Sequence, residues 1–426
     1  MLTTTVYQPT RAFAGEMDRQ DPLRHYRDQF HLPLRANGHP HLYFCGNSLG
    51  LQPKITRRYV EQELADWERL GVEGHFHARN PWMPYHEFLT ETTARVVGAL
   101  PSEVVVMNSL TVNLHLLMVS FFRPTPERFK IIIEADAFPS DRYAVTSQLK
   151  FHGYDPAEAL IELRSKSGHP VIPTEEILEV IEREGDQVAL VMLGGVNYYT
   201  GQAFAMEKIA AAGHAKGCTV GFDLAHAAGN LHLKLHEWNV DFACWCSYKY
   251  LNSGPGGLSG IFVHERHATA DLPRFAGWWG HNQDNRFQMP PDFEPMPGAE
   301  GWQLSNPPIL ALAALRASME IFDEVGMARL REKSERLTGY LEFLIQNRIQ
   351  SDAMRVITPS DPAQRGCQLS LQTLTPDGRA LFDRFTEAGV IADWREPDVI
   401  RLAPVPLYNT FTEVWDFVEL LRNGGN

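Results

Sequence analysis

Residues 219–257 read TVGFDLAHAAGNLHLKLHEWNVDFACWCSYKYLNSGPGG, and two apolar runs in this stretch each end beside a reactive side chain. The run 219–222 leads into Asp223, and the run 242–246 leads into Lys249 and a glycine-rich turn. Strands this apolar on both faces are typical of a parallel sheet covered by helices. Reactive groups of such α/β folds collect in loops beyond the carboxyl ends of the strands, so this stretch predicts both the fold and its site.

The same alternation of apolar runs and helical stretches extends over residues 60–265. We predict further strands at 104–107, 130–133, 159–163, 188–193 and 258–263, with helices at 111–122, 174–184 and 206–216. Because strands alternate with helices along the chain, the pattern predicts an α/β fold with a mostly parallel sheet covered by helices.

A proline- and glycine-rich segment, Pro290–Gly301, separates this region from the rest of the chain. After it we predict two helices over Ile309–Asn347, and then strand, helix, strand, strand and helix over 368–422. We therefore predict a large cofactor-binding domain over residues 45–300. A smaller α+β domain is predicted from residues 1–44 and 301–426.

The composition is that of a globular chain, and it narrows the classes of function. The 426 residues carry 39 Lys and Arg against 52 Asp and Glu, a net charge of −13, which disfavours nucleic acids and anionic membranes as partners. No targeting segment precedes Asp21, and the richest apolar run, Leu110–Phe122, is too short to span a membrane. Five scattered cysteines predict reduced thiols and no metal site, so we expect a cytoplasmic protein.

Asp223 and Lys249 together predict a pyridoxal 5′-phosphate site. Taken alone, Asp223 is as readily a helix cap or an ion-pair partner, and Lys249 is as readily a solvated surface lysine. At neighbouring strand ends they match the two groups that this cofactor needs. The amine forms a Schiff base, and the carboxylate keeps the ring nitrogen protonated so that the ring can accept electrons.

Three further positions match other parts of the same complex. A strand runs into a helix at MNSLTVNL, residues 107–114, where Ser109 or Thr111 is placed to cap the helix and its N–H groups to cradle a phosphate. Phe138 follows the strand 130–133 and is placed to stack on a flat ring. Arg401 follows a predicted strand in the smaller domain, and a guanidinium binds a carboxylate with two hydrogen bonds. An ordinary capped helix, core packing and a surface salt bridge are the alternative interpretations.

Ordered motifs over roughly residues 40–415 resemble the kynureninase family. They are FCGNSLGLQPK (44–54), LTVNLHLLM (110–118), AFPSD (137–141), GFDLAH (221–226), WCSYKYLN (245–252), GWWGH (277–281), SNPPIL (305–310), GCQL (366–369) and RLAPVPLYN (401–409). The Asp and Lys pair alone points only to the wider aminotransferase-like superfamily. The resemblance implies the aminotransferase-like fold of fold-type I pyridoxal phosphate enzymes.

The resemblance also implies a role for each matching residue. Lys249 looks like the Schiff-base lysine, and Tyr248 is similar to a phenol that contacts the phosphate and assists proton transfer. The implied cofactor-binding set is Leu110, Thr111, Phe138, Asp141, Asp223, His226, Tyr248, Lys249, Trp278 and Asn306, and the implied substrate-binding set is Arg401, Ser48 and His75. Trp278 and Asn306 match positions that the other subunit contributes, so the resemblance implies a homodimer with shared active sites.

The implied reaction is the hydrolysis of L-kynurenine to anthranilate and L-alanine, a step of tryptophan degradation and of NAD-related metabolism. Lys249 would remove the α-proton of the substrate, and Tyr248 and Lys249 would carry protons in later steps. His75 lies in a motif that the resemblance places beside the aromatic ring, and a hydrogen bond from it to a ring hydroxyl predicts that 3-hydroxykynurenine is also cleaved. Simple packing of His75 against the ring is the alternative.

One position departs from the family pattern. Some family members carry a phosphate-binding Ser where this chain has Gly194, before Gly195 and Val196, so a backbone N–H is expected to replace the hydroxyl.

Two rival functions are weighed against the resemblance. In a cysteine desulfurase, Cys367 would be the nucleophile, but the sequence around it predicts a turn entering a strand rather than a long loop. A non-catalytic regulatory protein that binds the cofactor would need a basic DNA-binding extension, and none is visible.

Overall fold

The computed structural model describes residues 6–349 and 353–424, and these form two compact units. The larger unit holds Ile55–Tyr198 and Phe204–Glu324, and the smaller holds the chain up to Lys54, Tyr199–Ala203 and the chain from Val325 onward. These units place residues 301–324 with the larger part of the chain, whereas the predicted division at residues 45 and 300 stays a prediction about domains.

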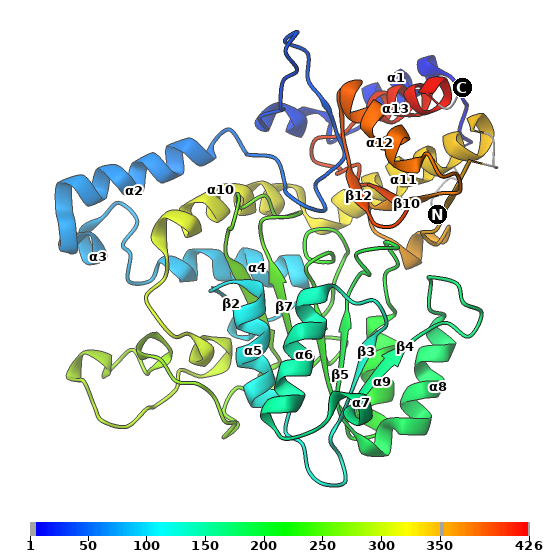
Figure 1. Cartoon of the computed structure of the whole chain (residues 1–426). Helices are drawn as coiled ribbons and strands as arrows, with labels where there is room; N and C mark the ends of the chain where they lie inside the picture. Colours follow the sequence, from blue (N-terminus) through cyan, green and yellow to red (C-terminus); the bar gives the residue numbers. More distant parts are fainter. Residues whose placement is uncertain (1–5, 350–352, 425–426) are drawn as a thin grey trace. The chain divides into compact units, whose positions relative to one another are not determined.

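A seven-stranded, mostly parallel sheet forms the centre of the larger unit, as Figure 1 shows. Its order is β2-β8-β7-β6-β5-β3-β4, and only β8 runs against its neighbours. The strands are β2 (Val104–Met107), β3 (Lys130–Glu134), β4 (Leu160–Leu163), β5 (Val188–Gly194), β6 (Thr219–Asp223), β7 (Phe242–Cys246) and β8 (Ser259–Val263). The predicted α/β fold with a mostly parallel sheet is confirmed.

Helices cover both faces of this sheet. Leu190 and Met192 of β5 belong to the core cluster beneath α5 (Leu110–Phe121) and α6 (Pro139–Phe151). Val191, which points the other way because side chains alternate along a strand, faces Gly213 of α9 (Met206–Ala215). The unit's other helices are α2 (Thr56–Leu70), α3 (Gly74–His77), α4 (Thr90–Val97), α7 (Pro156–Ala159), α8 (Thr174–Glu184) and α10 (Ile309–Val325).

The smaller unit is an α+β layer. Its sheet has the order β12-β13-β10-β9, and a two-stranded pair joins β1 to β11. The strands are β1 (Leu42–Tyr43), β9 (Met354–Val356), β10 (Leu369–Thr373), β11 (Val390–Ile391), β12 (Asp393–Arg395) and β13 (Val399–Leu402). The helices are α1 (Arg11–Gln20), α11 (Met327–Arg348), α12 (Gly378–Glu387) and α13 (Phe411–Gly424).

The predicted elements agree with the structure to within a residue or two for most of the chain. Helix α9 ends at Ala215, and Gly217 adopts the left-handed φ of 72° that follows a helix end. In the C-terminal layer the sequence predicted two strands after its first helix, whereas the structure has the three strands β11, β12 and β13 there. Strands of two to three residues carry too short a pattern to be separated from a turn. No helix among residues 6–349 and 353–424 has the length and apolarity needed to cross a membrane.

Candidate active site

A pocket of the larger unit lies where four neighbouring strands end. Glu134 ends β3, Gly194 ends β5 and Asp223 ends β6, while Lys249 follows β7 by three residues. Since these strands are parallel neighbours, their carboxyl ends meet at one edge of the sheet. The other lining residues are Leu110, Phe138, Asp141, Val196, Tyr198, Ala225, His226 and Tyr248.

Lys249 is held between two aromatic side chains. Its Nζ lies 5.8 Å from the centre of the Phe138 ring and 6.0 Å from the centre of the Tyr248 ring, and the residue is only 9% exposed. The chain then turns away through left-handed residues, with φ of 52° at Asn252 and 92° at Gly254. Glycine adopts such angles without a steric penalty, which is the reason for the glycine-rich turn after Lys249.

Asp223 and Asp141 form a buried carboxyl pair in this pocket. Burial raises the pKa of Asp223, and the ammonium group of Lys249 opposes that rise. Burial and then the nearby Asp223 carboxyl raise the pKa of Asp141 well above its usual range. The backbone N–H of Ala225 donates to Asp223 Oδ1 at 2.7 Å, whereas Asp141 Oδ1 has no hydrogen-bond partner among the described residues. The pair therefore has capacity to bind a further polar group.

Glu134 is a third buried carboxyl group in the pocket, and the sequence analysis missed it. Its two oxygens accept the backbone N–H of Gly194 at 3.2 and 3.1 Å. Burial raises the pKa of Glu134 to about 7, and the Asp223 carboxyl adds to the rise. The predicted strand stopped at Ile133, one residue short of this acid, although a carboxylate at the end of an apolar run was the signal that singled out Asp223.

The Gly194 expectation changes for the same reason. The N–H of Gly194 is bound to Glu134, and the N–H of Gly195 donates to the Asp223 carbonyl oxygen at 2.7 Å. Both groups are therefore already used, so the idea that this backbone replaces a phosphate-binding hydroxyl finds no support at these two residues. A Cβ at position 194 would also lie 2.8 Å from Glu134 Oε1, too close for any side chain.

The first turn of α5 presents free N–H groups at the pocket. Ser109 is the N-cap residue but makes no side-chain cap hydrogen bond, and Thr111 Oγ1 lies 2.7 Å from Ser140 Oγ instead. The expected cap by Ser109 or Thr111 is therefore wrong, because Ser140 of α6 engages the threonine. The unused N–H groups and the helix dipole make this helix start suitable for an anion, and Leu110 places it in the pocket.

These features fit a flat, phosphorylated pyridine. Phe138 supplies an aromatic face, the buried carboxyls at 141 and 223 suit a protonated ring nitrogen, and Lys249 supplies an amine beside the ring. The start of α5 would hold the phosphate.

We predict that Glu134→Gln changes how the stability of the apoprotein depends on pH. Up to about pH 7 the folded chain keeps Glu134 protonated, whereas the unfolded chain releases this proton near pH ~4.3. The folded state thus binds more protons in this window, so the free energy of unfolding should fall as pH rises, by up to about 3 kcal/mol in total. Thermal unfolding of the apoprotein at pH 5 and pH 8 measures this, and an identical pH dependence in wild type and variant would contradict it.

A separate charged cluster in the smaller unit contains Arg401 and Ser48. The guanidinium of Arg401 is 1% exposed and pairs with Asp393, with Nη2 at 2.7 Å from Oδ2 and Nε at 3.2 Å from Oδ1. Ser48 Oγ donates to Asp393 Oδ2 at 2.6 Å and accepts from Arg401 Nη2 at 3.2 Å. Burial would raise the pKa of Asp393, but Arg401 and these hydrogen bonds hold it below the usual value. The sequence analysis did not single out Asp393.

The remaining predicted residues lie outside the pocket lining of their own chain. His75 Nδ1 lies 2.9 Å from the Val72 carbonyl oxygen, and its ring meets Trp82 edge-on at 5.4 Å. Trp278 is 38% exposed and donates to the Arg286 carbonyl oxygen at 3.2 Å, and Asn306 is exposed. Cys367 is buried two residues before β10, which does not suit a nucleophile on a mobile loop.

Similar proteins carry one name throughout. A model of the family described as "Kynureninase C-terminal domain" matches residues 330–421. Curated relatives named kynureninase include those of Myxococcus xanthus, 61% identical over 99% of each chain, and Koribacter versatilis, 60% identical over 98% of each chain. That of Flavobacterium johnsoniae is 55% identical over 98% of this chain and 99% of its own.

Solved structures share the fold at much lower identity. A mutant of C-DES with glycine covalently linked to its PLP cofactor is 18% identical, with a TM-score of 0.76 over 93% of this chain and 99% of that one. A cysteine desulfurase from Thermococcus onnurineus is 14% identical, with a TM-score of 0.74 over 99% of each chain. At this identity the likeness shows a common fold and no common substrate.

Proposed function

The chain belongs to the kynureninase family, and we propose that it hydrolyses L-kynurenine in the pocket of Lys249 and Asp223. The products are anthranilate and L-alanine, the cofactor is pyridoxal 5′-phosphate, and the enzyme is a hydrolase of carbon–carbon bonds in ketonic substrates. The observation that carries the proposal is one pocket lined by a lysine, an aromatic ring and buried carboxyls, in a chain 61% identical to a curated kynureninase.

The pocket residues divide the work of binding and proton transfer. When bound, pyridoxal phosphate supplies an aldehyde that captures the substrate amine and an electron-poor ring that stabilises negative charge on the substrate's carbon atoms. Asp223 keeps a proton on the ring nitrogen, with Asp141 and His226 beside it. Phe138 stacks on the ring, and the N–H groups at Leu110 and Thr111 hold the phosphate. Lys249 holds the cofactor between turnovers and moves the proton of the substrate's α-carbon.

Tyr248 is proposed as the second proton carrier. Burial, and then the nearby Cys246 thiol, raise the pKa of the Tyr248 phenol, so the group stays protonated at neutral pH. A neutral phenol beside Lys249 suits the role of a general acid, which donates a proton as the carbon–carbon bond breaks.

Arg401 and Ser48 are proposed to bind the substrate carboxylate. The bidentate pair with Asp393 fixes the plane of the Arg401 guanidinium, and a fixed plane costs less conformational entropy when a second carboxylate binds. We expect Arg401→Lys to raise KM by at least about tenfold, because lysine keeps the charge but loses the paired donors. Steady-state kinetics of the folded variant measure this, and an unchanged KM would remove Arg401 from the substrate site.

The site is proposed to accept 3-hydroxykynurenine as well, with His75 as the group that faces the ring hydroxyl. The proposed place of the enzyme is tryptophan degradation, and through 3-hydroxyanthranilate the supply of NAD. A cytoplasmic location agrees with the composition and the free cysteines of the chain.

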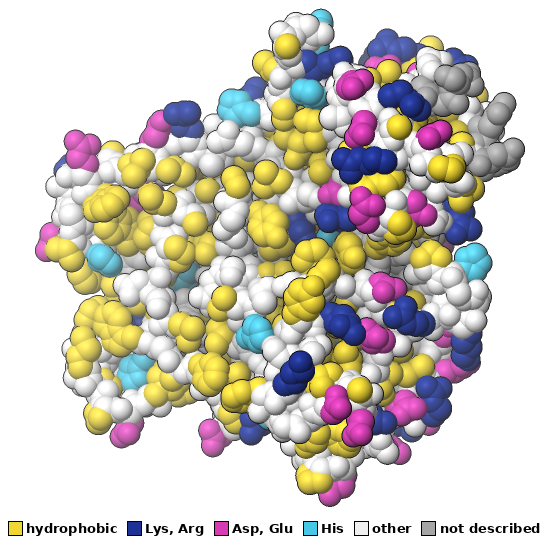
Figure 2. Space-filling model, viewed as in Figure 1, with side chains coloured by type: hydrophobic (Ala, Val, Ile, Leu, Met, Phe, Trp, Pro, Cys, Tyr) yellow, Lys and Arg dark blue, Asp and Glu magenta, His cyan; other side chains and the backbone are white. Residues whose placement is uncertain are grey.

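We propose a homodimer in which Trp278 and Asn306 complete the site of the partner. Exposed aromatic and apolar side chains close to Trp278 support this: Phe275, Phe287 and Met289. In Figure 2 hydrophobic side chains gather on the lower left of the visible face, where Figure 1 draws the yellow-green segment before α10. Monomers seldom leave such side chains to solvent in a group.

The direct test of this function is product release. Purified protein loaded with pyridoxal phosphate is expected to convert L-kynurenine to fluorescent anthranilate and 3-hydroxykynurenine to 3-hydroxyanthranilate. Alanine should appear in equal amount in each reaction. Failure to release either aromatic acid would contradict the proposal.

A further inference from the structure

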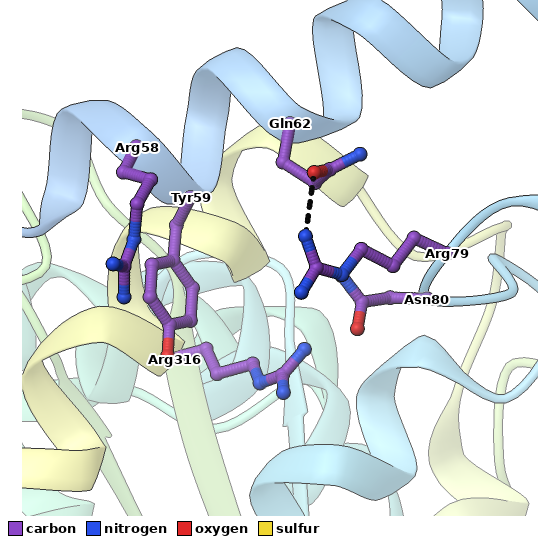
Figure 3. A pocket seen from close by; sticks show the side chains of 6 residues that line it. All are labelled: Arg58, Tyr59, Gln62, Arg79, Asn80 and Arg316. Atoms are coloured by element: carbon purple, nitrogen blue, oxygen red, sulfur yellow. Dashed lines mark hydrogen bonds between the residues drawn. The ribbon is translucent and has the colours of Figure 1, made fainter.

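The largest arginine-lined cavity of the larger unit lies on the outer side of α2 and shares no residue with the pocket of Lys249. Figure 3 shows its six lining residues, Arg58, Tyr59, Gln62, Arg79, Asn80 and Arg316. Its volume is about 240 Å³, and a water in the liquid takes ~30 Å³, so the cavity holds a small solute together with several waters. Sites for drug-sized ligands begin near ~300 Å³, which limits the fit to a compact molecule.

The three guanidiniums come from separate parts of the chain. Arg58 lies on α2, Arg79 follows α3, and Arg316 lies on α10, and Figure 3 shows all three side chains reaching toward the same space. Like charges that face one another repel, so this arrangement is unfavourable unless an anion sits between them. In a chain of net charge −13, such a cluster is a local exception.

Two of these arginines lack the carboxylate partner that their neighbours have. On α2, Arg57 pairs with Glu61 at 3.2 Å and Arg69 pairs with Asp66 at 2.7 Å. Within the described parts of the chain, neither Arg58 nor Arg79 has a carboxylate oxygen within 4.0 Å. Their charges are therefore available to a ligand.

Arg79 is nevertheless oriented. Its Nη1 donates to Gln62 Oε1 at 3.2 Å, and Gln62 Nε2 donates in turn to Asp66 Oδ2 at 3.0 Å. Asp66 also accepts the backbone N–H of Arg79 at 3.0 Å. This chain of hydrogen bonds fixes which way the Gln62 amide points and holds the Arg79 head at the cavity wall. The side-chain amide of Asn80 is fixed as well, since its Nδ2 donates to the buried Glu63 at 2.9 Å.

Arg316 is fixed by aromatic rings. Its guanidinium carbon lies 5.1 Å from the centre of the Phe88 ring and 5.5 Å from that of Tyr59. Nε lies 3.6 Å from Glu320, which also accepts the Tyr59 hydroxyl, while Nη1 has no hydrogen-bond partner in the described structure. One carboxylate thus balances part of the charge, and donor capacity remains unused.

From this cavity we infer a binding site for a compact divalent oxyanion, an inorganic phosphate or a small dicarboxylate, held by Arg58, Arg79 and Arg316. Planar guanidiniums donate paired hydrogen bonds to phosphate and carboxylate alike, which accounts for three arginines where lysines would supply the same charge. The cavity is too small for a nucleotide and carries too few apolar side chains for an aromatic ligand.

Calorimetric titration of the holoenzyme at constant ionic strength tests the inference, because bound cofactor fills its own phosphate cradle. Inorganic phosphate, or malonate in a parallel titration, is expected to bind saturably to wild type. The tighter of the two identifies the class of ligand. In the double variant Arg58→Gln, Arg79→Gln binding should weaken between about tenfold and a hundredfold, since hydrogen bonds to charged groups are lost.

Arg57→Gln is the matched control. It removes the same charge from the same helix, but Arg57 does not line the cavity, so affinity should stay within about twofold of wild type. Thermal unfolding of each variant shows that it is folded. The inference is overturned if neither anion binds wild type, as when a second copy fills the cavity with its own acidic side chain. It is also overturned if the double variant binds as wild type does, or if Arg57→Gln loses as much affinity as the double variant.

Discussion

Lys249→Ala should abolish both the visible absorbance of bound cofactor and the release of anthranilate. Without the amine, the cofactor loses its covalent anchor in a pocket where Lys249 Nζ faces Phe138, and the substrate loses the group that takes its α-proton. General acid–base catalysis alone contributes up to about 10⁴-fold, so we expect kcat to fall by at least that factor. Absorbance spectra and single-turnover assays measure the two effects.

Lys234→Ala serves as the control for this substitution. Lys234 is a surface lysine that pairs with Glu237 at 2.8 Å and does not line the pocket, so its loss should leave spectrum and rate unchanged. Near-normal turnover in Lys249→Ala would show that another group holds the cofactor.

Asp223→Asn should leave the cofactor bound but lower kcat by about 10² to 10³-fold, as expected when one preorganised electrostatic partner of the transition state is removed. The amide is the same size and can still accept the Ala225 N–H that Asp223 Oδ1 accepts now. It carries no negative charge, however, so it no longer holds a proton on the ring nitrogen. The pH at which the bound cofactor changes its absorbance should shift together with the rate.

Asp241→Asn separates this effect from the loss of any buried carboxylate. Burial would raise the pKa of Asp241, but His214, His267 and Arg266 hold it far below its usual range. Its amide variant should therefore lose stability and keep the cofactor's absorbance and kcat. If Asp241→Asn and Asp223→Asn lowered kcat equally, the special role of Asp223 would be refuted.

The central sheet and its reactive ends could be predicted from local sequence. Strands β2 and β7 begin and end where the apolar runs do, because a buried strand must be apolar on both faces. Lys249 and Asp223 follow such runs directly, so one rule about strand ends located both of them.

The partners of the functional residues could not be predicted, because they depend on pairing across the chain. Asp393 faces Arg401 in the register of β12 and β13, and Ser48 reaches both from 345 residues away in the case of Asp393. Short strands such as β12 leave no periodic signal. Glu134 has the same origin: its contact with Gly194 follows from β3 lying next to β5, an order that the sequence does not reveal.

Mapping the covalent attachment site tests the central claim most directly. Reduction of the holoenzyme with borohydride, followed by digestion and mass spectrometry, should place the phosphopyridoxyl group on the peptide that contains Lys249, and nowhere else in stoichiometric amount. A label on a different lysine, or no label in protein that still cleaves kynurenine, would contradict the account.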